Sequence, residues 1–481
     1  MKKLINILLP LLLLFPHILY SQDLTFSVPD KIKGKIVFSE ILGEYKDYYY
    51  VVRYDKKAEQ AFVFEKYSKD LRLVRNLEFQ IANGINVEDI HFMDGLIYFF
   101  TSQYNKDEKA IKLYCTIYDE GFVVNDKENL IASSTISPSE GKLFKIEYDK
   151  LYKQIAVLYP FEKVKEVVKF RMLLLNSFLE TENAAETRIS YEREFNIENL
   201  ELFNGQLAAL ISFKSSGVFK GNQQQLDFYY YNLKTDVRRI RSLAFDSIKM
   251  SNSIFRYDFV NQEYLISGFY TDSEYNDLIG MGVLRYIVNA DSLSTHFLPF
   301  SKEMVTGISG IYDATGIRNF FPKGLILRDD RGFVMISEYY SVQREVQNDY
   351  YAVNNTVVKY YYRFSDIMVV SVNHDGQVDW NKIIRKDQQT MNDEGYYSSF
   401  MFASLSDKIV LLFNDFSRSR WNLLYNVINP DGEVDFEVLV NGNNFTGSFV
   451  PKNGRQVGLS ELLIPAIDSK HGFSLLKIQL K

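Results

Sequence analysis

The sequence has very little of what builds covalent or metal-held folds. Among 481 residues there is one cysteine, Cys115, so no intramolecular disulfide can form. The apolar run 113–117 around it favours a packed strand over a reactive thiol. The histidines beyond the first 21 residues are far apart and lack the paired spacing of zinc ligands: His91, His296, His374 and His471. We therefore expect neither a metal site nor a cofactor.

An excess of positive charge is also absent. The chain has 55 Lys and Arg against 61 Asp and Glu, a formal net charge of -6. Proteins that bind nucleic acids normally carry a basic footprint, so DNA and RNA are not expected partners. The small arginine clusters at 238–241 and 418–420 are interpreted as solvated strand faces and turns.

Long apolar runs are missing after the N-terminus. Lys2 and Lys3 precede an apolar stretch at 7–15, interrupted by Pro10, and a small residue follows at Ser21. The pattern predicts a signal peptide over 1–21, cleaved near Ser21/Gln22; an uncleaved anchor is the alternative, but the run is shorter than the ~20 residues that span a bilayer. No cysteine follows the cleavage point, so lipoprotein anchoring is not expected.

The predicted location follows from this segment. Without a later membrane helix, the mature chain, 22–481, is expected to be exported from a bacterial cell. It would be periplasmic, associated with the outer membrane or at the cell surface. Removing Lys2 and Lys3 would move its formal charge to about -8.

Helical periodicity is scarce, whereas aromatic residues are abundant. Tyr 34 and Phe 37 bring the aromatic content to 15%, and such residues suit half-buried strands. Short β-prone runs recur along the chain, for example at 48–52, 96–100, 154–159, 264–269 and 409–413. The best helical candidate, 161–170, contains valines that fit a strand at least as well. The composition indicates an all-β fold.

One motif occurs twice. Residues 373–380 and 429–436 align position by position, and each copy places an Asp-Gly pair, Asp375-Gly376 or Asp431-Gly432, ahead of a strand. This pair supplies the positive φ that a tight hairpin requires. Weaker turns at 68–70, 120–123, 181–183, 234–236 and 290–292 extend the pattern. The period of about 50 to 60 residues is typical of repeat architectures.

Each unit is predicted to contain four strands. In the last clear unit we expect them at 398–404, 408–413, 421–428 and 433–440. The two hairpin copies resemble repeats of bacterial exported β-propellers, in which an Asp-Gly turn leads into a strand bearing Trp or Phe, here Trp380 and Phe436. The resemblance implies a β-propeller of four-stranded blades, although no particular propeller subfamily is matched.

The repeat length favours eight blades over seven. Strand-like stretches at 462–464 and 473–478 remain after the seventh unit, and 24–28 and 35–42 are available to pair with them. Pairing the two chain ends would close the ring and remove exposed sheet edges. We therefore predict a single propeller domain over 22–481; a two-domain β-sandwich is the competing fold.

The spacing between Asp291 and Gly376 exceeds one blade by about 30 residues, so we place an insertion at 341–359. Insertions in repeat arrays usually form loops on one face, often the binding face. Tyrosine suits such a face because it combines a rigid ring with a hydroxyl. The candidate binding residues are Tyr339, Tyr340, Arg344, Tyr350, Tyr351 and Tyr360. An extended hairpin without a ligand is the alternative.

Catalytic motifs do not match. Residues 307–310 lack the second glycine of a nucleophile elbow, and 280–282 lack the third glycine of a dinucleotide loop. The Asn-x-Asp-Gly segments lack the downstream Glu of a calcium loop. The carboxylate pairs Asp329-Asp330 and Asp393-Glu394 lie in predicted turns, where acidic residues are common. No catalytic residue is assigned.

The expected function is that of a non-catalytic binding scaffold. Its partner would be an envelope protein or an extracellular polymer such as a glycan. The alternative is a carbohydrate-active hydrolase or lyase with acidic residues in the propeller funnel. At least three acidic or His side chains converging there would favour the enzyme, whereas an apolar channel and an aromatic patch on one face would favour the scaffold.

Overall fold

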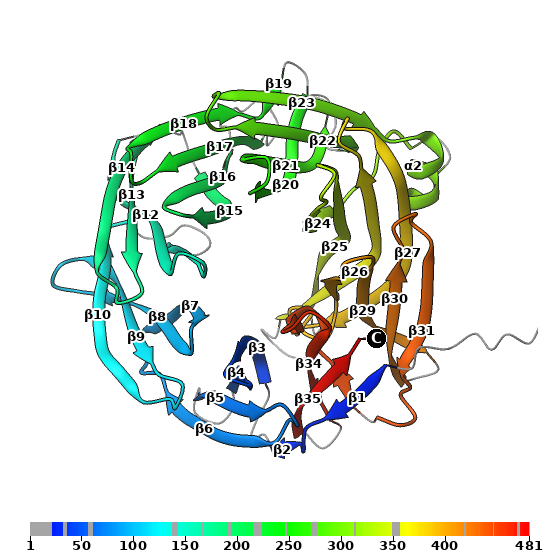
Figure 1. Ribbon diagram of the computed structural model, residues 1–481, viewed down its shortest axis with the longest axis horizontal. Coiled ribbons are helices and arrows are strands. Elements are labelled where there is room, and N and C mark those ends of the chain that lie inside the picture. The colour runs from blue at the N-terminus through cyan, green and yellow to red at the C-terminus, as the bar shows by residue number, and fades with distance from the viewer. Residues whose placement is uncertain are drawn as a thin grey trace, which may run out of the picture.

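The computed structural model describes residues 22–31, 36–55, 61–136, 143–165, 167–190, 194–214, 224–245, 248–271, 277–311, 314–348, 356–417, 420–445, 447–468 and 472–480. Their strands form eight antiparallel sheets arranged as the blades of a ring (Figure 1). The predicted all-β propeller is thus the observed fold, and eight is the number of sheets that the sequence favoured. The predicted signal peptide, 1–21, lies outside the described residues.

The first four blades follow chain order from the centre to the rim. Blade 1 comprises β3 (Ile36–Tyr45), β4 (Tyr48–Asp55), β5 (Ala61–Ser68) and β6 (Leu73–Gln80), and blade 2 comprises β7 (Ile85–Met93), β8 (Leu96–Asn105), β9 (Ala110–Tyr118) and β10 (Val124–Ser134). Blade 3 comprises β11 (Lys145–Asp149), β12 (Gln154–Val164), β13 (Val167–Asn176) and β14 (Thr181–Ser190). Blade 4 comprises β15 (Glu194–Phe203), β16 (Gln206–Lys214), β17 (Gln224–Asn232) and β18 (Val237–Ser242).

Blades 5 to 7 continue the pattern, with α2 (Lys302–Ser309) between blades 5 and 6. Blade 5 comprises β19 (Ala244–Phe245), β20 (Ile248–Asp258), β21 (Glu263–Thr271), β22 (Leu278–Ile287) and β23 (Ser292–Pro299). Blade 6 comprises β24 (Phe320–Leu327), β25 (Phe333–Asn348), β26 (Thr356–Val372) and β27 (Val378–Met391). Blade 7 comprises β28 (Phe400–Ser404), β29 (Ile409–Ser417), β30 (Arg420–Ile428) and β31 (Val434–Val440).

Blade 8 joins the two ends of the chain, as predicted, although the stretch 35–42 forms β3 of blade 1 and does not pair with the C-terminal strands. Near the C-terminus are β32 (Ser448–Phe449), the 3-10 helix η1 (Pro451–Asn453), β33 (Arg455–Gln456), β34 (Glu461–Ile467) and β35 (Gly472–Gln479). The N-terminal strands β1 (Asp23–Phe26) and β2 (Asp30–Lys31) pair with β35 and form the rim of this blade. In Figure 1 the blue N-terminal strands lie beside the red C-terminal ones.

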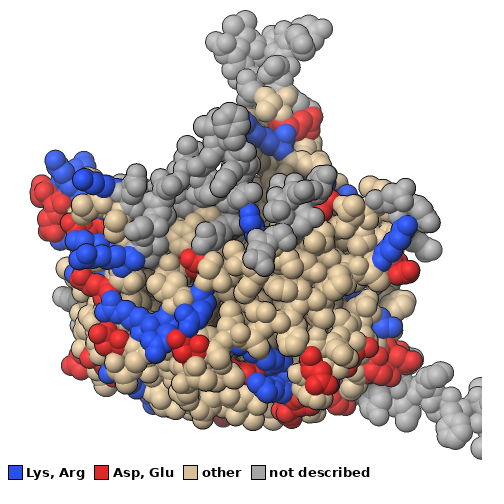
Figure 2. Space-filling view, turned by 90° about the horizontal axis from the view of Figure 1, so that it is seen from above, with Lys and Arg blue, Asp and Glu red and all other residues tan. Residues whose placement is uncertain are grey.

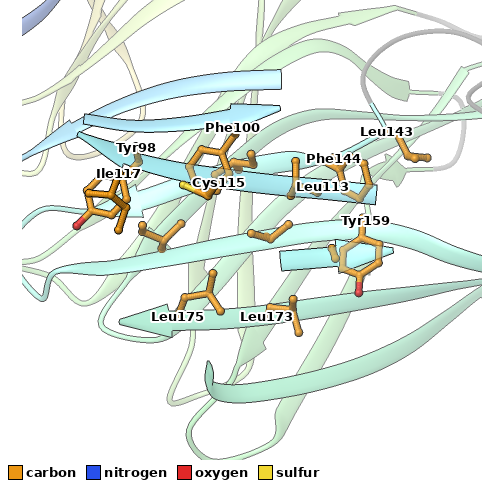
Figure 3. Packing of buried hydrophobic residues seen from close by; sticks show 14 of the residues in the cluster. Tyr98, Phe100, Leu113, Cys115, Ile117, Leu143, Phe144, Tyr159, Leu173 and Leu175 are labelled. Carbon is orange, nitrogen blue, oxygen red and sulfur yellow. The ribbon is translucent and has the colours of Figure 1, made fainter. Parts of the chain in front are cut away.

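The apolar core lies between successive blades. Figure 3 shows one such layer, in which Phe100 and Cys115 of blade 2 face Phe144, Tyr159 and the leucines of blade 3. Cys115 is fully buried there, and burial raises the pKa of its thiol. The predicted structural role of this cysteine is thereby supported, because a buried thiol with a raised pKa is a poor nucleophile.

Buried ion pairs reinforce several blade contacts. Glu263 of β21, which is fully buried, accepts hydrogen bonds from Arg285 at 2.7 Å and from Arg331 of the next blade at 2.6 Å. Arg53 bonds to the buried Glu65 at 3.0 Å and to Asp30 of β2 at 2.6 Å. Each cluster links neighbouring sheets, because one of its members belongs to the adjacent blade.

The repeated Asp-Gly hairpins also connect blades. Gly376 and Gly432 have φ values of 76° and 82°, as predicted for these turns. Trp380 donates a hydrogen bond from its indole nitrogen to the carbonyl oxygen of Pro430 at 2.8 Å, so its ring covers the turn of the next blade. Only the first copy makes this contact, because Phe436, the equivalent residue of the second copy, is 74% exposed.

Two local predictions differ from the structure. A turn is predicted at 181–183, but β14 already begins at Thr181. The turn lies just before this strand, where Leu179 has a φ of 64°. The segment 161–170, whose valines fit a strand at least as well as a helix, does lie in the strands β12 and β13. The extra residues after Asp291 do not all fall in 341–359, because α2 and its flanking segments take up the chain between β23 and β24.

Candidate functional site

Blade 6 carries the predicted insertion as an extension of three of its strands. The innermost strand β24 pairs with β25 only as far as Tyr339, whereas β25 continues to Asn348. Its partner β26 begins at Thr356, and β27 reaches Met391. We call residues 340–348, 356–366 and 385–391 the blade 6 extension. Because β24 stops short, the edge of β25 beyond Tyr340 has no paired strand among the described residues.

The extension and the Asp-Gly turns lie on opposite faces of the ring. Neighbouring strands of a blade are antiparallel, so its first and third connections share one face and its second connection lies on the other. The Asp375-Gly376 hairpin is the third connection of blade 6, and the β25–β26 hairpin is the second. The edge-on view in Figure 2 shows one projection rising above the ring, with acidic and basic side chains on it.

The predicted binding residues are distributed over the extension. Tyr339 and Tyr340 are half-buried at its base, while Arg344 and Tyr360 are exposed and directly opposite each other in the β25–β26 register. Tyr350 and Tyr351 lie outside the described residues. The six residues therefore do not form one cluster: two lie at the base and two along the strands. Their role in binding stays a prediction.

Exposed apolar side chains accompany these tyrosines. They are Val342, Val346, Val357, Tyr360 and Met391, each between 40% and 50% exposed. In a strand, alternate residues point to opposite faces, so Val342, Arg344 and Val346 share one face with Tyr360. The extension thus combines an open strand edge with a mixed apolar, aromatic and charged face.

Two pockets flank the base of the extension. On the Tyr339 side, a pocket of about 670 Å³ is lined by residues between α2 and β24 and by Arg363 and Asp366. Hydrogen bonding to Ser341, together with Asn319, lowers the pKa of Tyr339 there. On the Tyr340 side, a pocket of about 420 Å³ is lined by Tyr340, Phe364, Ser399 and two lysines, Lys323 and Lys452.

The second pocket contains residues that the sequence did not single out. Lys323 is on β24, Ser399 precedes β28, and Lys452 is in η1, so three blades contribute. They lie in no shared motif, and only the fold brings them together.

Acidic residues do gather on the innermost strands of blades 2 to 4. We call Asp89, His91, Glu147 and Glu201 the inner acidic group. His91 Nε2 lies 3.5 Å from Asp89 Oδ2, and its ring is 4.2 Å from that of Tyr148. Glu201 accepts a hydrogen bond from the backbone N–H of Tyr257 at 3.0 Å. In Figure 1 the strands β7 and β15, which carry Asp89, His91 and Glu201, lie towards the centre of the ring.

The environment of this group shifts two carboxyl pKa values upwards. Burial raises the pKa of Glu201 to about 7, and Glu147 adds to the shift, while Arg256 and the Tyr257 N–H oppose it. Burial likewise raises the pKa of Glu147, with Asp89 adding and His91 opposing. A carboxyl group with a pKa near 7 can donate a proton at neutral pH. The group thus contains one carboxyl group, that of Glu201, whose pKa suits a proton donor.

Among the residues that the structure describes, no three His, Cys, Asp or Glu side chains are arranged to hold an ion. In this described part of the chain, none of the helices is long and apolar enough to cross a membrane.

Comparison with known proteins gives similarities of fold. The chain matches no protein-family model and no curated protein. It aligns with the WD40 domain of SCAP from fission yeast at 10% identity and a TM-score of 0.43, covering 95% of this chain and 98% of that one. The β-propeller domain of the Trilobed protease from Pyrococcus furiosus aligns at 10% identity and a TM-score of 0.38, covering 85% and 99%.

An enzyme is also among the aligned structures. The Bombyx mori GH32 β-fructofuranosidase BmSUC1 aligns at 10% identity and a TM-score of 0.30, covering 96% of this chain and 94% of that one. These likenesses concern the fold alone.

Proposed function

We propose that this protein is an exported scaffold that binds an envelope protein or an extracellular polymer through the face carrying the blade 6 extension. The observation that carries the proposal is the extension itself, in which β25 runs past its inner neighbour and leaves an open strand edge beside exposed valines and Tyr360. Open edges accept added strands, and tyrosine-rich surfaces are typical of binding sites.

Export is part of the same proposal. It is supported by the basic start and short apolar run of residues 1–21. It is also compatible with a fold that dispenses with disulfides, because packed sheets and buried ion pairs hold the blades together. Fractionation of cells with antibody against the mature chain, together with N-terminal sequencing, would test it. A cytoplasmic, uncleaved product would contradict it.

The binding face can be tested by deleting residues 341–359. The β25–β26 register pairs Tyr340 with Phe364, so in the deletion variant residues 360–363 would form a four-residue connection. We expect partner capture to be lost, measured by cross-linking and affinity purification from the native envelope followed by mass spectrometry. The melting temperature should change little, because the eight sheets keep their central strands.

A matched control removes a connection on the opposite face. Replacing 373–376 by an unrelated turn sequence alters the first clear repeat hairpin and leaves the extension intact. Capture by this control and not by the deletion variant is the expected pattern. Equal capture by both variants would refute a binding role for the extension.

The inner acidic group favours a second candidate function, a carbohydrate-active hydrolase or lyase. Glu201 would act as the proton donor, because its pKa of about 7 keeps a large fraction protonated at neutral pH. Glu147, on the neighbouring inner strand, would be the second carboxylate. The test is the release of reducing ends from a panel of polysaccharides. Release by the wild type and Glu433→Gln but not by Glu201→Gln would support this candidate. If the wild type released none from any polysaccharide, the result would count against it.

A further inference from the structure

The 420 Å³ pocket lies where blades 6, 7 and 8 meet, at the base of the extension. Its size falls within the range of small-ligand pockets, roughly 300–1,000 Å³. Lys323 comes from β24, Tyr340 and Phe364 from the base of the extension, Ser399 from the segment before β28, and Lys452 from η1. A ligand here would touch all three blades.

Two lysines, Lys323 and Lys452, line this pocket, and neither ammonium group forms a direct ion pair among the described residues. In the described chain, no carboxylate lies within ion-pair distance, 4.0 Å, of Lys323 or Lys452. Lys452 instead donates to the backbone carbonyl oxygen of Gly395 at 2.8 Å. Burial lowers the pKa of Lys452, and the charge of Lys323 lowers it further, while Asp393 and Glu394 oppose the shift. An anion between the lysines would relieve this repulsion.

The buried carboxylate that bonds to the pocket wall, Glu338, is already committed to other partners. Glu338 accepts a hydrogen bond from Lys386 Nζ at 2.6 Å and another from Ser399 Oγ at 2.6 Å. The backbone N–H of Ser399 donates to Gln388 Oε1 at 2.7 Å. These bonds hold Ser399 at φ 73°, a backbone conformation that non-glycine residues rarely adopt. The pocket wall is therefore fixed before any ligand arrives.

The remaining wall is apolar and aromatic. The rings of Tyr340 and Phe364 lie 4.7 Å apart, and Phe400, Met401, Phe402 and Gly454 complete the lining. A ligand that fits must therefore present an apolar surface as well as a negative charge. A sugar ring offers C–H faces to aromatic side chains and hydroxyl groups to polar ones, and a uronic acid adds the carboxylate.

We propose that this pocket binds an acidic sugar residue, with its carboxylate between Lys323 and Lys452 and its ring against Tyr340 and Phe364. The pocket has room for one or two such residues, whereas an extended acidic peptide would present repeated charges to a single pair of lysines. The proposal deepens the proposed function, since it names the chemistry of the polymer that the face would bind. The sugar could be free or part of a polymer.

Calorimetric titration of the mature chain, 22–481, tests the proposal with four ligands: D-glucuronate, a glucuronate-containing oligosaccharide, neutral D-glucose and a triglutamate peptide. We expect glucuronate to bind and glucose to bind at least tenfold more weakly. Lys323→Gln and Lys452→Gln should each weaken glucuronate binding by about five- to fiftyfold, because a charge-assisted contact is lost. The double variant should give no detectable heat. Lys382→Gln, in β27 outside the pocket lining, is the matched control.

Lys452→Gln also removes the bond to Gly395, so its melting temperature must be measured beside its affinity. Lys323 makes no such bond in the described chain, and Lys323→Gln alone keeps the test valid if the other variant unfolds. Equal binding of glucose, unchanged affinity in the double variant, or preference for a triglutamate peptide would overturn the proposal. Tighter binding of the oligosaccharide than of D-glucuronate would identify a polymer as the source of the sugar. Equal affinities for these two ligands would identify the free acid.

The test is independent of the scaffold proposal. Deletion of 341–359 leaves Tyr340, Phe364 and both lysines in place, so glucuronate binding should persist in that variant. Loss of partner capture with retained glucuronate binding would support both proposals. If glucuronate binds but the deletion does not affect partner capture, only the proposal for the pocket is supported.

Discussion

Gly432 shows how one residue position ties a repeat to its neighbour. Its φ of 82° belongs to a region that non-glycine residues enter at a cost of about 1–2 kcal/mol. A Cβ atom added there would also lie 2.7 Å from the ring of Trp380 in the preceding blade. Two separate constraints therefore select glycine at this turn.

These constraints can be separated by two substitutions. We expect Gly432→Ala to lower the free energy of unfolding by about 2–4 kcal/mol, through backbone strain and overpacking together. Gly84 has a similar φ of 86° but has no atom within 4 Å of an added Cβ, so Gly84→Ala should cost only about 1 kcal/mol. Urea denaturation measures both variants. Equal losses would show that contact with Trp380 contributes nothing.

Glu201 makes stability depend on pH. Its carboxyl pKa is raised from 4.5 to about 7 in the folded chain, so the native state binds more protons than the unfolded state between these values. Stability is therefore expected to fall as pH rises from about 4.5 to 7 and then to level off. The side chain is 20% exposed, so about 3 kcal/mol is an upper bound for the effect.

Glu201→Gln tests this linkage. The variant should lack this component of the pH dependence and should gain stability over the wild type at pH 8 more than at pH 4.5. Thermal unfolding at several pH values measures it. Glu433→Gln, in an exposed turn, controls for the loss of one negative charge. Parallel pH profiles for wild type and Glu201→Gln would contradict the assignment.

At the scale of elements, the contact between blades 6 and 7 depends on a buried charge. Glu338 and Lys386 are almost fully buried and bond at 2.6 Å, with Ser399 and Gln388 completing the network. Burial lowers the pKa of Lys386, and Glu338 opposes that shift. A buried pair of this kind is costly to break, because the remaining partner keeps an uncompensated charge.

Lys386→Met should therefore destabilise the protein by about 3–5 kcal/mol. Adding Glu338→Gln should recover part of that loss, because no lone charge is left in the interface. The neighbouring exposed pair of Arg363 and Asp387, at 2.8 Å, provides the control, and Asp387→Asn should cost no more than about 1 kcal/mol. A double-mutant cycle in urea measures the coupling. Additive losses for Glu338 and Lys386 would argue against a coupled pair.

Elements differ in how well the sequence predicted them. The Asp-Gly hairpins were predictable because their turn chemistry is local. The turn before Thr181 was misplaced because Leu179 takes the left-handed position there and Asn176 holds the turn with its side chain, bonding to the N–H groups of Phe178 and Glu180. The eight-residue helix α2 was missed, although Ser301 caps its start and Gly310 its end.

The candidate site was predictable only in part, because some of its residues are far apart in the sequence. Adjacent tyrosines at 339 and 340 are visible in the sequence, and the strand alternation sends them towards different pockets. Lys323 and Lys452 are separated by more than two blades of sequence, so nothing local links them. Their proximity follows from the closure of the ring, which places η1 beside blades 6 and 7.

For the whole molecule, closure depends on a short N-terminal segment. β1 pairs with β35 over four residues from Asp23 to Phe26, and β2 adds Asp30 and Lys31. Ser27 donates from its backbone N–H to the carbonyl oxygen of Leu475 at 2.9 Å. This segment covers the outer edge of β35, which would otherwise be exposed to pairing with another chain.

Removal of residues 22–31 is expected to open the ring at blade 8. The edge of β35 would be uncovered, and Arg53 would lose its 2.6 Å bond to Asp30 while keeping Glu65. We expect a lower melting temperature and concentration-dependent association through the exposed edge, measured by calorimetry and size-exclusion chromatography with light scattering. Asp30→Asn removes the ion pair and keeps the strand, so it should remain monomeric and lose far less stability. A truncated chain that stays monomeric with an unchanged melting temperature would show that the ring holds together without its N-terminal strands.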